Sequence, residues 1–577
     1  MENDSQKRLM LALVASFALT AVYMLLGGGG PGAAKPPPSP LDAGVPAVSA
    51  AAAPATASAV IVPPGPGPAS VSALPARTVT VERPEVHYAL SSDGAGLTSA
   101  ILQGPKMREV RRLTVAEGFA LLVGKEVPPA PQMNLAEPVE GRPLPLSVSV
   151  SGGAPVPAEL RYAVTEEGPT GVTFVGRTSD WEVTKHFAFS PDGFELNVSI
   201  ALRNLTSQPL NGELGIHEAR AIDPTHEEKP SMFGGVGNLS DAVCLVKDSL
   251  QKLSPTDKPE SKDLPGQVSF AGVNQQYFLS AVFPVGEARD GHCVIAASPV
   301  AREATAWFAF QVPAGGTVTQ SFGAFLGPKD SELLAAVPTL AANRAGSIWS
   351  PRLERAVDFG IWAVICKLML VILRFFHGVV SNWGVAIILL TVVVKVLLLP
   401  LTHRMMVSQE KMKKLQPKLE ALKAKHPNDR EKQQQETMRV YQEAGVNPFG
   451  SCLMLLVQLP IWAALFTTLR NNFEIYREPF LHHFLPDLTF KDPTYILPVL
   501  LGVSQIVTGL LQPMAMDAAQ QRIMIWFMPI FFTGIMLNYP AGLLLYIFTN
   551  NVLTVAQTYA LKKWLQRAPP PTPEKRK

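Results

Sequence analysis

The sequence predicts a multi-pass α-helical membrane protein with six spanning helices and an all-β sandwich domain outside the cytoplasm. Only 17% of the 577 residues are charged and the mean hydropathy is +0.17, as in proteins whose apolar surface faces lipid. Apolar runs of spanning length recur along the chain, and a long region of short alternating runs separates the first from the others. A chain of this length is also expected to contain at least two structural units.

Residues 1–26 are predicted to form a transmembrane anchor. After Lys7 and Arg8, the run Leu9–Leu26 is apolar over about 18 residues, which crosses a hydrocarbon core of roughly 30 Å. A cleavable signal peptide is the alternative, but the run is longer than a usual signal-peptide core and Gly27–Gly30 offers no good cleavage motif. The basic residues before the run place the N-terminus in the cytoplasm.

Residues 27–77 and 78–332 are predicted to form a linker and a β-sandwich domain, respectively. Ala, Pro, Gly and Ser dominate the first segment, and this composition cannot bury a core. In the second segment, short alternating or β-branched runs are broken by turn residues, and Ser190–Gly193 is predicted to join two of them as a hairpin. The predicted strands are Val79–Tyr88, Leu146–Val150, Val172–Gly176, Trp181–Ser190, Phe194–Leu202, Gln267–Phe283 and Thr305–Val312.

The four cysteines do not predict a metal site. Cys244, Cys293, Cys366 and Cys452 include no CxxC pair and no histidine at zinc-ligand spacing. Whether Cys244 and Cys293 form a disulfide in an oxidising compartment is left open by the sequence.

The region 333–383 is predicted to contain a helix that lies in the membrane interface. Phe359–Phe376 is apolar enough to span, but Lys367 and Arg374 lie seven residues apart and therefore on one helical face. A charged stripe of this kind suits a helix with one face in water. The other predicted spans are transmembrane helix 2 at 384–401 and transmembrane helices 3 to 6 within 451–561, with apolar runs at Val385–Leu401, Cys452–Leu469, Tyr495–Gln512, Ile523–Asn538 and Ala541–Leu561.

The distribution of charge predicts the topology. Lys and Arg outnumber Asp and Glu by ten to six in Thr402–Pro448 and by six to one from Lys562 onward, whereas the ratio is two to four in Asn471–Asp492. Because basic loops stay in the cytoplasm, both termini and the first of these segments are expected there.

Residues 402–450 are predicted to form a cytoplasmic helical hairpin, and residues 562–577 a basic tail. The helices Met405–Lys425 and Asp429–Ala444 are separated by the breakers His426-Pro427-Asn428. The basic exterior of the hairpin suits contact with a ribosome, a nascent chain or anionic headgroups, but a merely solvated helix face has the same pattern.

Lys395 is the residue that most needs an explanation within the membrane. It lies in the apolar run around Thr391–Pro400, where a charge costs about 2.5 to 3.5 kcal/mol on insertion scales. No Asp or Glu occurs in any predicted span, so the lysine either reaches the cytoplasmic edge or lies in a water-filled cavity. Polar residues at similar depth favour the cavity, although they are also typical of hydrogen bonds between helices: Thr391, Gln458, Ser504, Gln505, Thr508, Thr549, Asn550 and Asn551.

Several functional classes are disfavoured by what the sequence lacks. Ion-coupled transporters usually need carboxylates within the membrane, and no predicted span contains one. No GxxxxGK[ST], HExxH or GxSxG motif occurs, so neither an ATPase nor a hydrolase of those kinds is predicted. We therefore predict no catalytic residue and no cofactor.

An ordered series of motifs resembles the YidC family of membrane protein insertases, in its Gram-negative form with a large periplasmic domain. In the helical half these are Ser381–Gly384, Thr391–Thr402, Lys413–Lys418, Val446–Gly450, Gln458–Ile461, Tyr495–Pro498, Met528–Pro529 and Tyr539–Leu543, and in the outer domain Asn274–Phe278 and Gly327–Pro328. The resemblance implies a five-helix insertase core with a groove open to cytoplasm and lipid but closed to the periplasm. It also implies a periplasmic β-supersandwich similar to sugar mutarotases, without enzyme activity.

The resemblance also implies residue roles. The family groove contains a positive residue, usually arginine, whose position Lys395 occupies, and a second tyrosine often follows the one that matches Tyr546, where this chain has Ile547. Lysine keeps the charge but loses the planar fork of arginine. The groove residues expected from the resemblance and the spans are Lys395, Thr391, Gln458, Ser504, Gln505, Tyr546, Thr549 and Asn550.

The favoured hypothesis is an insertase and chaperone of the bacterial inner membrane that works alone or with the Sec translocon. Its expected partners are nascent membrane proteins, the Sec translocon with its accessory subunits, the lipid bilayer, and a ribosome or the signal recognition particle pathway through the hairpin and tail. One alternative is a channel or lipid transporter that uses the same cavity. Another makes the β-domain a carbohydrate binder or enzyme with the helices as its anchor.

Overall fold

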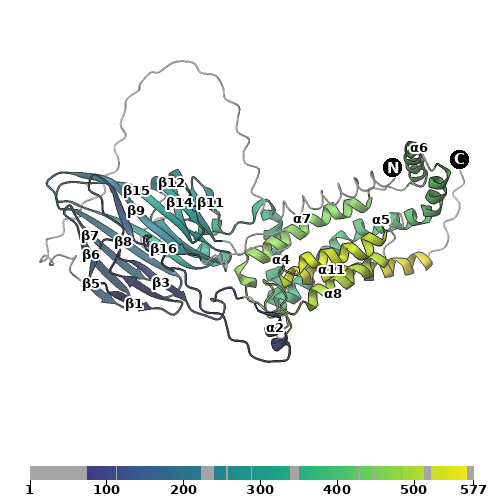
Figure 1. Cartoon of the computed structure of the whole chain (residues 1–577), viewed down its shortest axis with the longest axis horizontal. Coiled ribbons are helices and arrows are strands. Elements are labelled where there is room, and N and C mark those ends of the chain that lie inside the picture. The colour runs from purple at the N-terminus through teal and green to yellow at the C-terminus, as the bar shows by residue number, and fades with distance from the viewer. Residues whose placement is uncertain are drawn as a thin grey trace, which may run out of the picture.

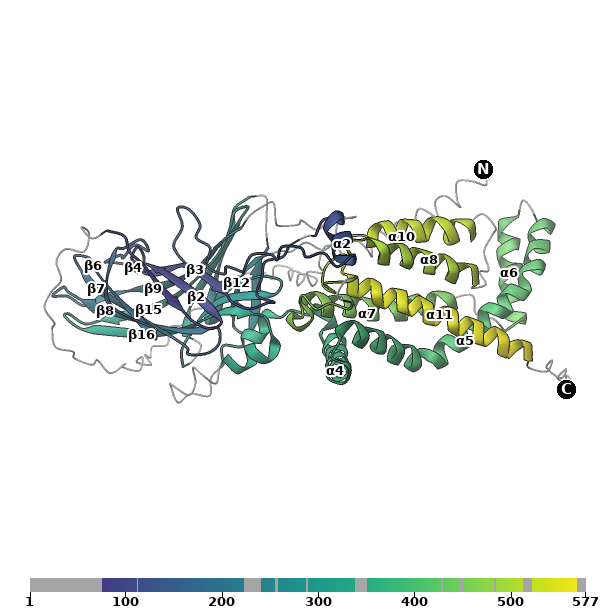
Figure 2. The same ribbon diagram turned by 90° about the horizontal axis from the view of Figure 1, so that it is seen from below.

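The computed structural model describes residues 75–111, 113–222, 240–254, 258–286, 289–337, 350–426, 429–445, 450–481, 484–511 and 521–567. The predicted anchor, most of the predicted linker and the last ten residues of the predicted tail lie outside them. A β-domain occupies one end of the molecule and a helical bundle the other (Figures 1 and 2).

The β-domain consists of one 13-stranded sheet and one three-stranded sheet, all of whose pairings are antiparallel. In the large sheet the order is β4-β9-β15-β14-β12-β13-β16-β8-β7-β6-β5, and β10 and β11 extend it from β12. The strands are β1 (Thr78–Glu82), β2 (Val86–Ser91), β3 (Gly96–Leu102), β4 (Val148–Gly152), β5 (Tyr162–Gly168), β6 (Gly171–Arg177), β7 (Trp181–Phe189), β8 (Glu195–Asn204), β9 (Leu210–Ala221), β10 (Asp241–Val246), β11 (Ser249–Leu253), β12 (Glu260–Asn274), β13 (Phe278–Pro284), β14 (Arg289–Ser298), β15 (Ala301–Val312) and β16 (Thr317–Pro328).

Alternating side chains account for the best-predicted strands. Along β8 every second residue is buried, and Val198, Ile200 and Leu202 are fully buried. This is the pattern of a strand with one face in the core. The hairpin predicted at Ser190–Gly193 is confirmed, because β7 and β8 pair along their whole length.

Two predicted strands are wrong in their extent. Val79–Tyr88 is a hairpin of β1 and β2, because Pro84 interrupts the strand and the Arg83 N–H bonds to the Val86 carbonyl at 3.1 Å. Gln267–Phe283 is likewise two strands, since a tight turn closed by the Gln275 N–H and the Phe278 carbonyl separates β12 from β13. The sequence analysis missed the strands without a clean alternation, namely β3, β5, β9, β10, β11, β14 and β16.

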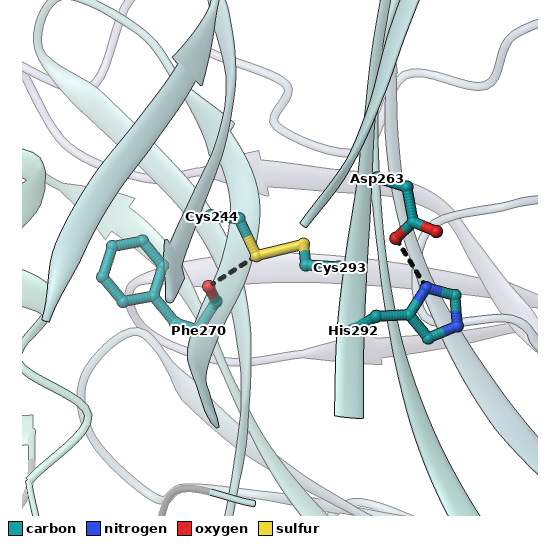
Figure 3. The surroundings of a disulfide bond; sticks show 5 residues. All are labelled: Cys244, Asp263, Phe270, His292 and Cys293. Carbon is teal, nitrogen blue, oxygen red and sulfur yellow. Dashed lines mark hydrogen bonds and ion pairs between the residues drawn. A yellow bond between two sulfur atoms is a disulfide. The ribbon is translucent and has the colours of Figure 1, made fainter. Parts of the chain in front are cut away.

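The structure pairs Cys244 on β10 with Cys293 on β14, which answers a question that the sequence left open (Figure 3). The two cysteines are 49 residues apart, so the chain-entropy model assigns the bond about 4 kcal/mol of stabilisation. A structural disulfide is expected in an oxidising compartment, which agrees with a domain outside the cytoplasm.

Glu218 should make the stability of the β-domain depend on pH. Its side chain is 1% exposed, and burial raises its pKa to about 7, although the hydrogen bond from Ser280 lowers it in part. Because the folded pKa lies above that of the unfolded chain, this group lowers the stability progressively as the pH rises from about 4.5 to about 7. Glu218→Gln is therefore expected to raise the thermal midpoint at pH 8 but not near pH 4.

Thermal unfolding of the full chain in detergent measures this effect, with the exposed Glu159 changed to Gln as the control. An equal shift at both pH values, or the same shift in the control, would contradict the assignment to Glu218.

The predicted apolar runs within the described residues are helical. The helices are α2 (Val115–Leu122), α4 (Ala363–Val380), α5 (Trp383–Lys425), α6 (Arg430–Glu443), α7 (Gly450–Asn471), α8 (Ile496–Leu511), α10 (Met528–Met536) with a π-helix (Ile523–Phe527) before it, and α11 (Ala541–Arg567). By length and composition, two described stretches suffice to cross a bilayer, namely Gly360–Val380 and Trp383–Met412.

The predicted boundary between transmembrane helix 2 and the hairpin at 401/402 falls inside a helix. Instead of two helices, Val385–Leu401 and Met405–Lys425 form parts of the single 43-residue α5, which continues through Pro400. α6 folds back against the end of α5, as the hairpin prediction requires (Figure 2). Leu419 is buried there, but Met438 is 43% exposed, so the apolar side of α6 is only partly covered.

The helix α4 has an exposed apolar stripe. Figure 2 shows it nearly along its axis, across the direction of α5, α8 and α11. Arg374 lies beside this stripe and forms ion pairs with Glu332 and Glu474 at the outer-domain side. The exposed apolar residues of α4 are Val364, Leu368, Val371, Phe375 and Val379. This arrangement supports the prediction of an interfacial helix, which stays a prediction.

A loop after α7 fixes the β-domain to the bundle. Phe473 and Tyr476 belong to the buried core of the β-domain, where Tyr476 stacks on Tyr277 with ring centroids 4.2 Å apart. The Tyr476 hydroxyl donates to the Arg108 carbonyl at 2.8 Å, and Lys106 forms an ion pair with Glu478. We call residues 472–480 the clamp loop, because they join two parts of the chain that are remote in sequence.

Candidate functional site

Lys395 lies on α5, the helix whose start is fixed by Asn382. The Asn382 side chain accepts the Val385 N–H at 3.0 Å, so α5 begins at a defined residue. Lys395 is twelve residues after Trp383 and is therefore about 18 Å along the helix. Its side chain is only 5% exposed. The lysine thus lies well inside the bundle.

The ammonium group of Lys395 is held by a hydroxyl group. Its Nζ donates to Thr554 Oγ1 on α11 at 2.7 Å, and that hydroxyl donates to the Asn550 carbonyl at 2.7 Å. None of the ion pairs recorded among the described residues includes Lys395, in agreement with the absence of acidic residues from the predicted spans. The lysine therefore points across to α11, and one neutral hydroxyl accepts its charge.

Two further pairs of polar side chains connect α11 to its neighbours. Gln458 Nε2 on α7 donates to the Tyr546 hydroxyl at 2.8 Å. Asn551 Nδ2 donates to Ser504 Oγ on α8 at 3.0 Å, and Ser504 itself donates to the Leu501 carbonyl. We call these six side chains the polar cluster: Lys395, Thr554, Gln458, Tyr546, Ser504 and Asn551.

The other predicted site residues take less direct positions. Thr391 is fully buried one turn before Lys395 and donates to the Ile387 carbonyl of its own helix at 2.7 Å. Gln505, Thr549 and Asn550 are half-buried, and Asn550 contributes its carbonyl to the Thr554 bond. The structure therefore joins four of the eight predicted residues through hydrogen bonds between helices: Lys395, Gln458, Ser504 and Tyr546.

Sequence reasoning missed Thr554, although its spacing pointed to it. Tyr546, Asn550 and Thr554 follow one another at four-residue intervals and therefore share one face of α11. A threonine in an apolar helix usually bonds to its own backbone, as Thr554 also does, and so attracts no attention.

Buried apolar side chains fill the bundle on the outer-domain side of the polar cluster. On each of the four helices they lie closer to the β-domain than the polar residue does: for example, Leu390 precedes Lys395 on α5, and Leu469 follows Gln458 on α7. We call this set the apolar plug, and its members are Ala386, Ile387, Leu390, Ala464, Leu465, Leu469, Leu497, Leu501, Leu543 and Leu544. Packing through the plug is close, since a Cβ on Gly542 would lie 3.3 Å from a methyl carbon of Ile387 and of Leu469.

The bundle interior is thus divided in two along its length. One half is apolar and tightly packed, and the other contains a cation with hydroxyl and amide groups. A polar group in the packed half would lose hydrogen bonds to water, which makes its burial there costly.

Comparisons with known families match both halves of the chain. A family model described as 60Kd inner membrane protein matches residues 375–568, and one described as YidC periplasmic domain matches residues 127–372. A protein named membrane protein insertase YidC from Anaeromyxobacter sp. (strain Fw109-5) is 36% identical over 510 residues, which cover 86% of each chain. A protein of the same name from Geobacter sulfurreducens is 32% identical over 416 residues, 71% of this chain and 72% of the relative.

Two solved structures are also similar. A crystal structure of an active YidC insertase with the first transmembrane domain resolved aligns with a TM-score of 0.37 and 20% identity, and covers 84% of this chain and 92% of the other. A galactose mutarotase related enzyme from Lactobacillus acidophilus aligns with 43% of this chain and 97% of its own, with a TM-score of 0.30 and 11% identity.

Proposed function

Because this chain belongs to the YidC family of membrane protein insertases, we propose that its client proteins enter the bilayer along the polar cluster. The chain is an inner membrane protein with a periplasmic domain, and it is an insertase, not an enzyme. The observation that best supports the proposal is the position of Lys395. It is buried, it donates to the Thr554 hydroxyl, and the packed apolar plug lies between it and the outer domain.

The polar cluster lowers the cost of bringing a client's polar segment into the membrane. Each unsatisfied backbone group in hydrocarbon costs several kcal/mol, so a polar flank needs partners on its way. Lys395, Gln458 and Asn551 offer donors, while the hydroxyl groups of Tyr546, Ser504 and Thr554 both donate and accept. Burial of the client's apolar segment in lipid supplies the driving force, and no nucleotide is needed.

The apolar plug closes this route towards the periplasm. A client therefore reaches the cluster from the cytoplasm and leaves sideways into lipid, which is the hydrophilic groove that the family resemblance implies. The remaining groove residues extend the polar lining on three of the four helices of the cluster, namely α5, α8 and α11: Thr391, Gln505, Thr549 and Asn550. A short helix would also thin the bilayer locally and so shorten the path of the client. The 14 residues of Ile523–Met536 span about 21 Å, less than the roughly 30 Å of a typical hydrocarbon core.

The proposed topology follows the charge distribution. Six spans include the anchor at 1–26 and a five-helix core, both termini lie in the cytoplasm, and α4 lies in the periplasmic interface. The basic hairpin of α5 and α6 and the basic tail are the surfaces that receive a nascent chain from a ribosome or the signal recognition particle pathway. In this arrangement the protein can act alone or together with the Sec translocon and its accessory subunits.

Crosslinking tests the proposed route directly. A photoreactive amino acid at Thr391, Gln458 or Tyr546 is expected to crosslink to a stalled nascent membrane protein. The same group at Val364, which is 83% exposed on α4, serves as the control and should crosslink to lipid but not to the early client. Equal client crosslinking at Val364 and at the cluster would contradict a defined route.

The alternative function, a channel or lipid transporter, uses the same polar residues. Pure liposomes that contain the chain separate the two functions, since an insertase should insert a client yet pass ions and lipids no faster than empty liposomes do. Rapid flux without insertion would favour the alternative.

A further inference from the structure

A long extension of the β-domain reaches the bundle. Residues 103–132 leave after β3 and return before β4, and we call them the finger. Its two arms are held together by backbone bonds, such as Glu109 N–H to the Pro131 carbonyl at 2.9 Å. At their base, Met133, the residue after the finger, donates its N–H to the Met107 carbonyl at 2.9 Å. The helix α2 forms its tip, and both views show this tip beside the outer-domain end of the bundle (Figures 1 and 2).

The fold of the tip is well defined. Thr114 and Glu117 form a capping box at the start of α2, and Arg111 forms an ion pair with Glu117. Gly118 packs on Pro493, just ahead of α8, so closely that a Cβ there would lie 2.8 Å from the Cβ of the proline. The orientation of α2 relative to α8 is therefore fixed by contact.

This contact leaves the other face of α2 exposed, and that face is apolar. Val115 and Phe119 on α2, and Val123 directly after its last residue, follow at four-residue intervals and are 45%, 48% and 71% exposed. Three exposed apolar side chains in one row at the tip of a projecting arm are costly in water. Some surface of matching chemistry should therefore cover them.

The position of α2 identifies that surface. Pro493 lies three residues before the start of α8, and the outward side chains of α8 are apolar. The exposed ones, all 39% to 59% exposed, are Val499, Leu500, Val503, Val507 and Leu510. In an inner membrane protein this side of α8 faces lipid. The apolar row on α2 thus lies next to the point where a lipid-facing helix reaches the periplasmic surface.

We propose that α2 docks into the periplasmic headgroup region of the bilayer through Val115, Phe119 and Val123, so that the finger is a lipid-binding element of the outer domain. Together with α4 and the clamp loop, it gives the β-domain a third point of attachment. This inference depends on family membership and not on the client route through the polar cluster.

Spin labelling of the full chain in lipid nanodiscs tests the proposal. Nitroxides are placed at F119C or, as the control, at L205C, in a chain with Cys366 and Cys452 changed to serine. The measured quantity is the ratio of collisions with oxygen, which is enriched in lipid, to collisions with a water-soluble nickel chelate. This ratio is expected to be severalfold higher at position 119 than at position 205. Leu205 is 42% exposed and directly follows the last residue of β8. At this end of β8, Arg203 pairs with Thr317 at the start of β16, which lies about 35 Å along β16 from the end nearest the bundle. Labels at V115C and V123C should agree with the label at F119C.

Two results would overturn the proposal. A label at position 119 that is as accessible to the nickel chelate as the label at 205 would place α2 in water. Low accessibility to both reagents would show that protein, such as a second copy of the chain, covers the helix. An unchanged thermal midpoint of each labelled chain shows that the fold is retained, and because client insertion is not the readout, failure here is distinct from failure of the proposed route.

Discussion

Replacing Lys395 with alanine is expected to reduce the insertion of a client with an acidic translocated tail by roughly ten- to a hundredfold, the equivalent of one charge-assisted hydrogen bond. The cation is buried and its hydrogen-bond partner within the described residues is the neutral Thr554, so it is free to exchange that hydroxyl for a client carboxylate. Insertion into proteoliposomes, measured by protease protection of the translocated tail, gives the ratio.

Matched variants separate charge from packing. Lys395→Arg keeps the charge and adds a planar pair of donors, so it should insert the acidic client at least as well as the original chain. Thr554→Val removes the hydroxyl that accepts the hydrogen bond but leaves the cation, and should be milder than Lys395→Ala. A client with a neutral tail should be much less affected by Lys395→Ala. If both clients lost insertion equally, the lysine would have a structural role only.

Tyr476→Ala is expected to loosen the attachment of the periplasmic domain to the membrane helices. The side chain is fully buried, stacks on Tyr277 and donates to the Arg108 carbonyl. Removing a buried aromatic ring of this size costs on the order of 3 to 5 kcal/mol. Because its partners belong to the β-domain and its backbone to the α7–α8 connection, that cost falls on the junction between the two halves.

Limited proteolysis and thermal unfolding in nanodiscs measure this loosening. We expect faster cleavage near residues 103–132 and a lower first unfolding transition, with Tyr559→Ala, a tyrosine that is 68% exposed on α11, as the control. Intact protection in Tyr476→Ala would mean that α4 and the remaining contacts of the clamp loop suffice. Client insertion by this variant then reports whether a firmly held outer domain matters for function.

Local patterns explain why most elements were predictable. Every apolar run that the sequence analysis identified within the described residues is helical, because a run of that length has few alternatives in lipid. Strands with clean alternation, such as β7 and β8, were found. In contrast, β12 and β13 were merged, since the turn between them at Gln275 contains neither proline nor glycine, the strongest turn signals. The long α5 was divided at 401/402 because the apolar run ends there and a basic segment begins, although the helix continues across this change in composition.

Part of the candidate site was predictable, because a polar side chain in an apolar helix costs free energy to bury and is therefore easily noticed in the sequence. Lys395 is easily noticed in its apolar run because it is charged. Gln458 and Ser504 are noticed for the same reason, although burial of a neutral polar side chain costs less free energy. Thr554 is not noticed in this way, since its hydroxyl is satisfied by its own helix whether or not a lysine is near. Its role depends on which face of α11 meets α5, and the sequence of either helix alone leaves that undetermined.

The sequence by itself determined the class of the protein, the two kinds of domain and the cation within an apolar helix, because hydropathy and charge act residue by residue against water and lipid. Tertiary structure alone decided that Cys244 meets Cys293, that Lys395 meets Thr554, that Tyr476 enters the core of the β-domain and that α2 turns an apolar row outward beside α8. Each of these depends on contacts between segments far apart in the chain, and such contacts are set by the packing of whole elements, not by the preferences of single residues.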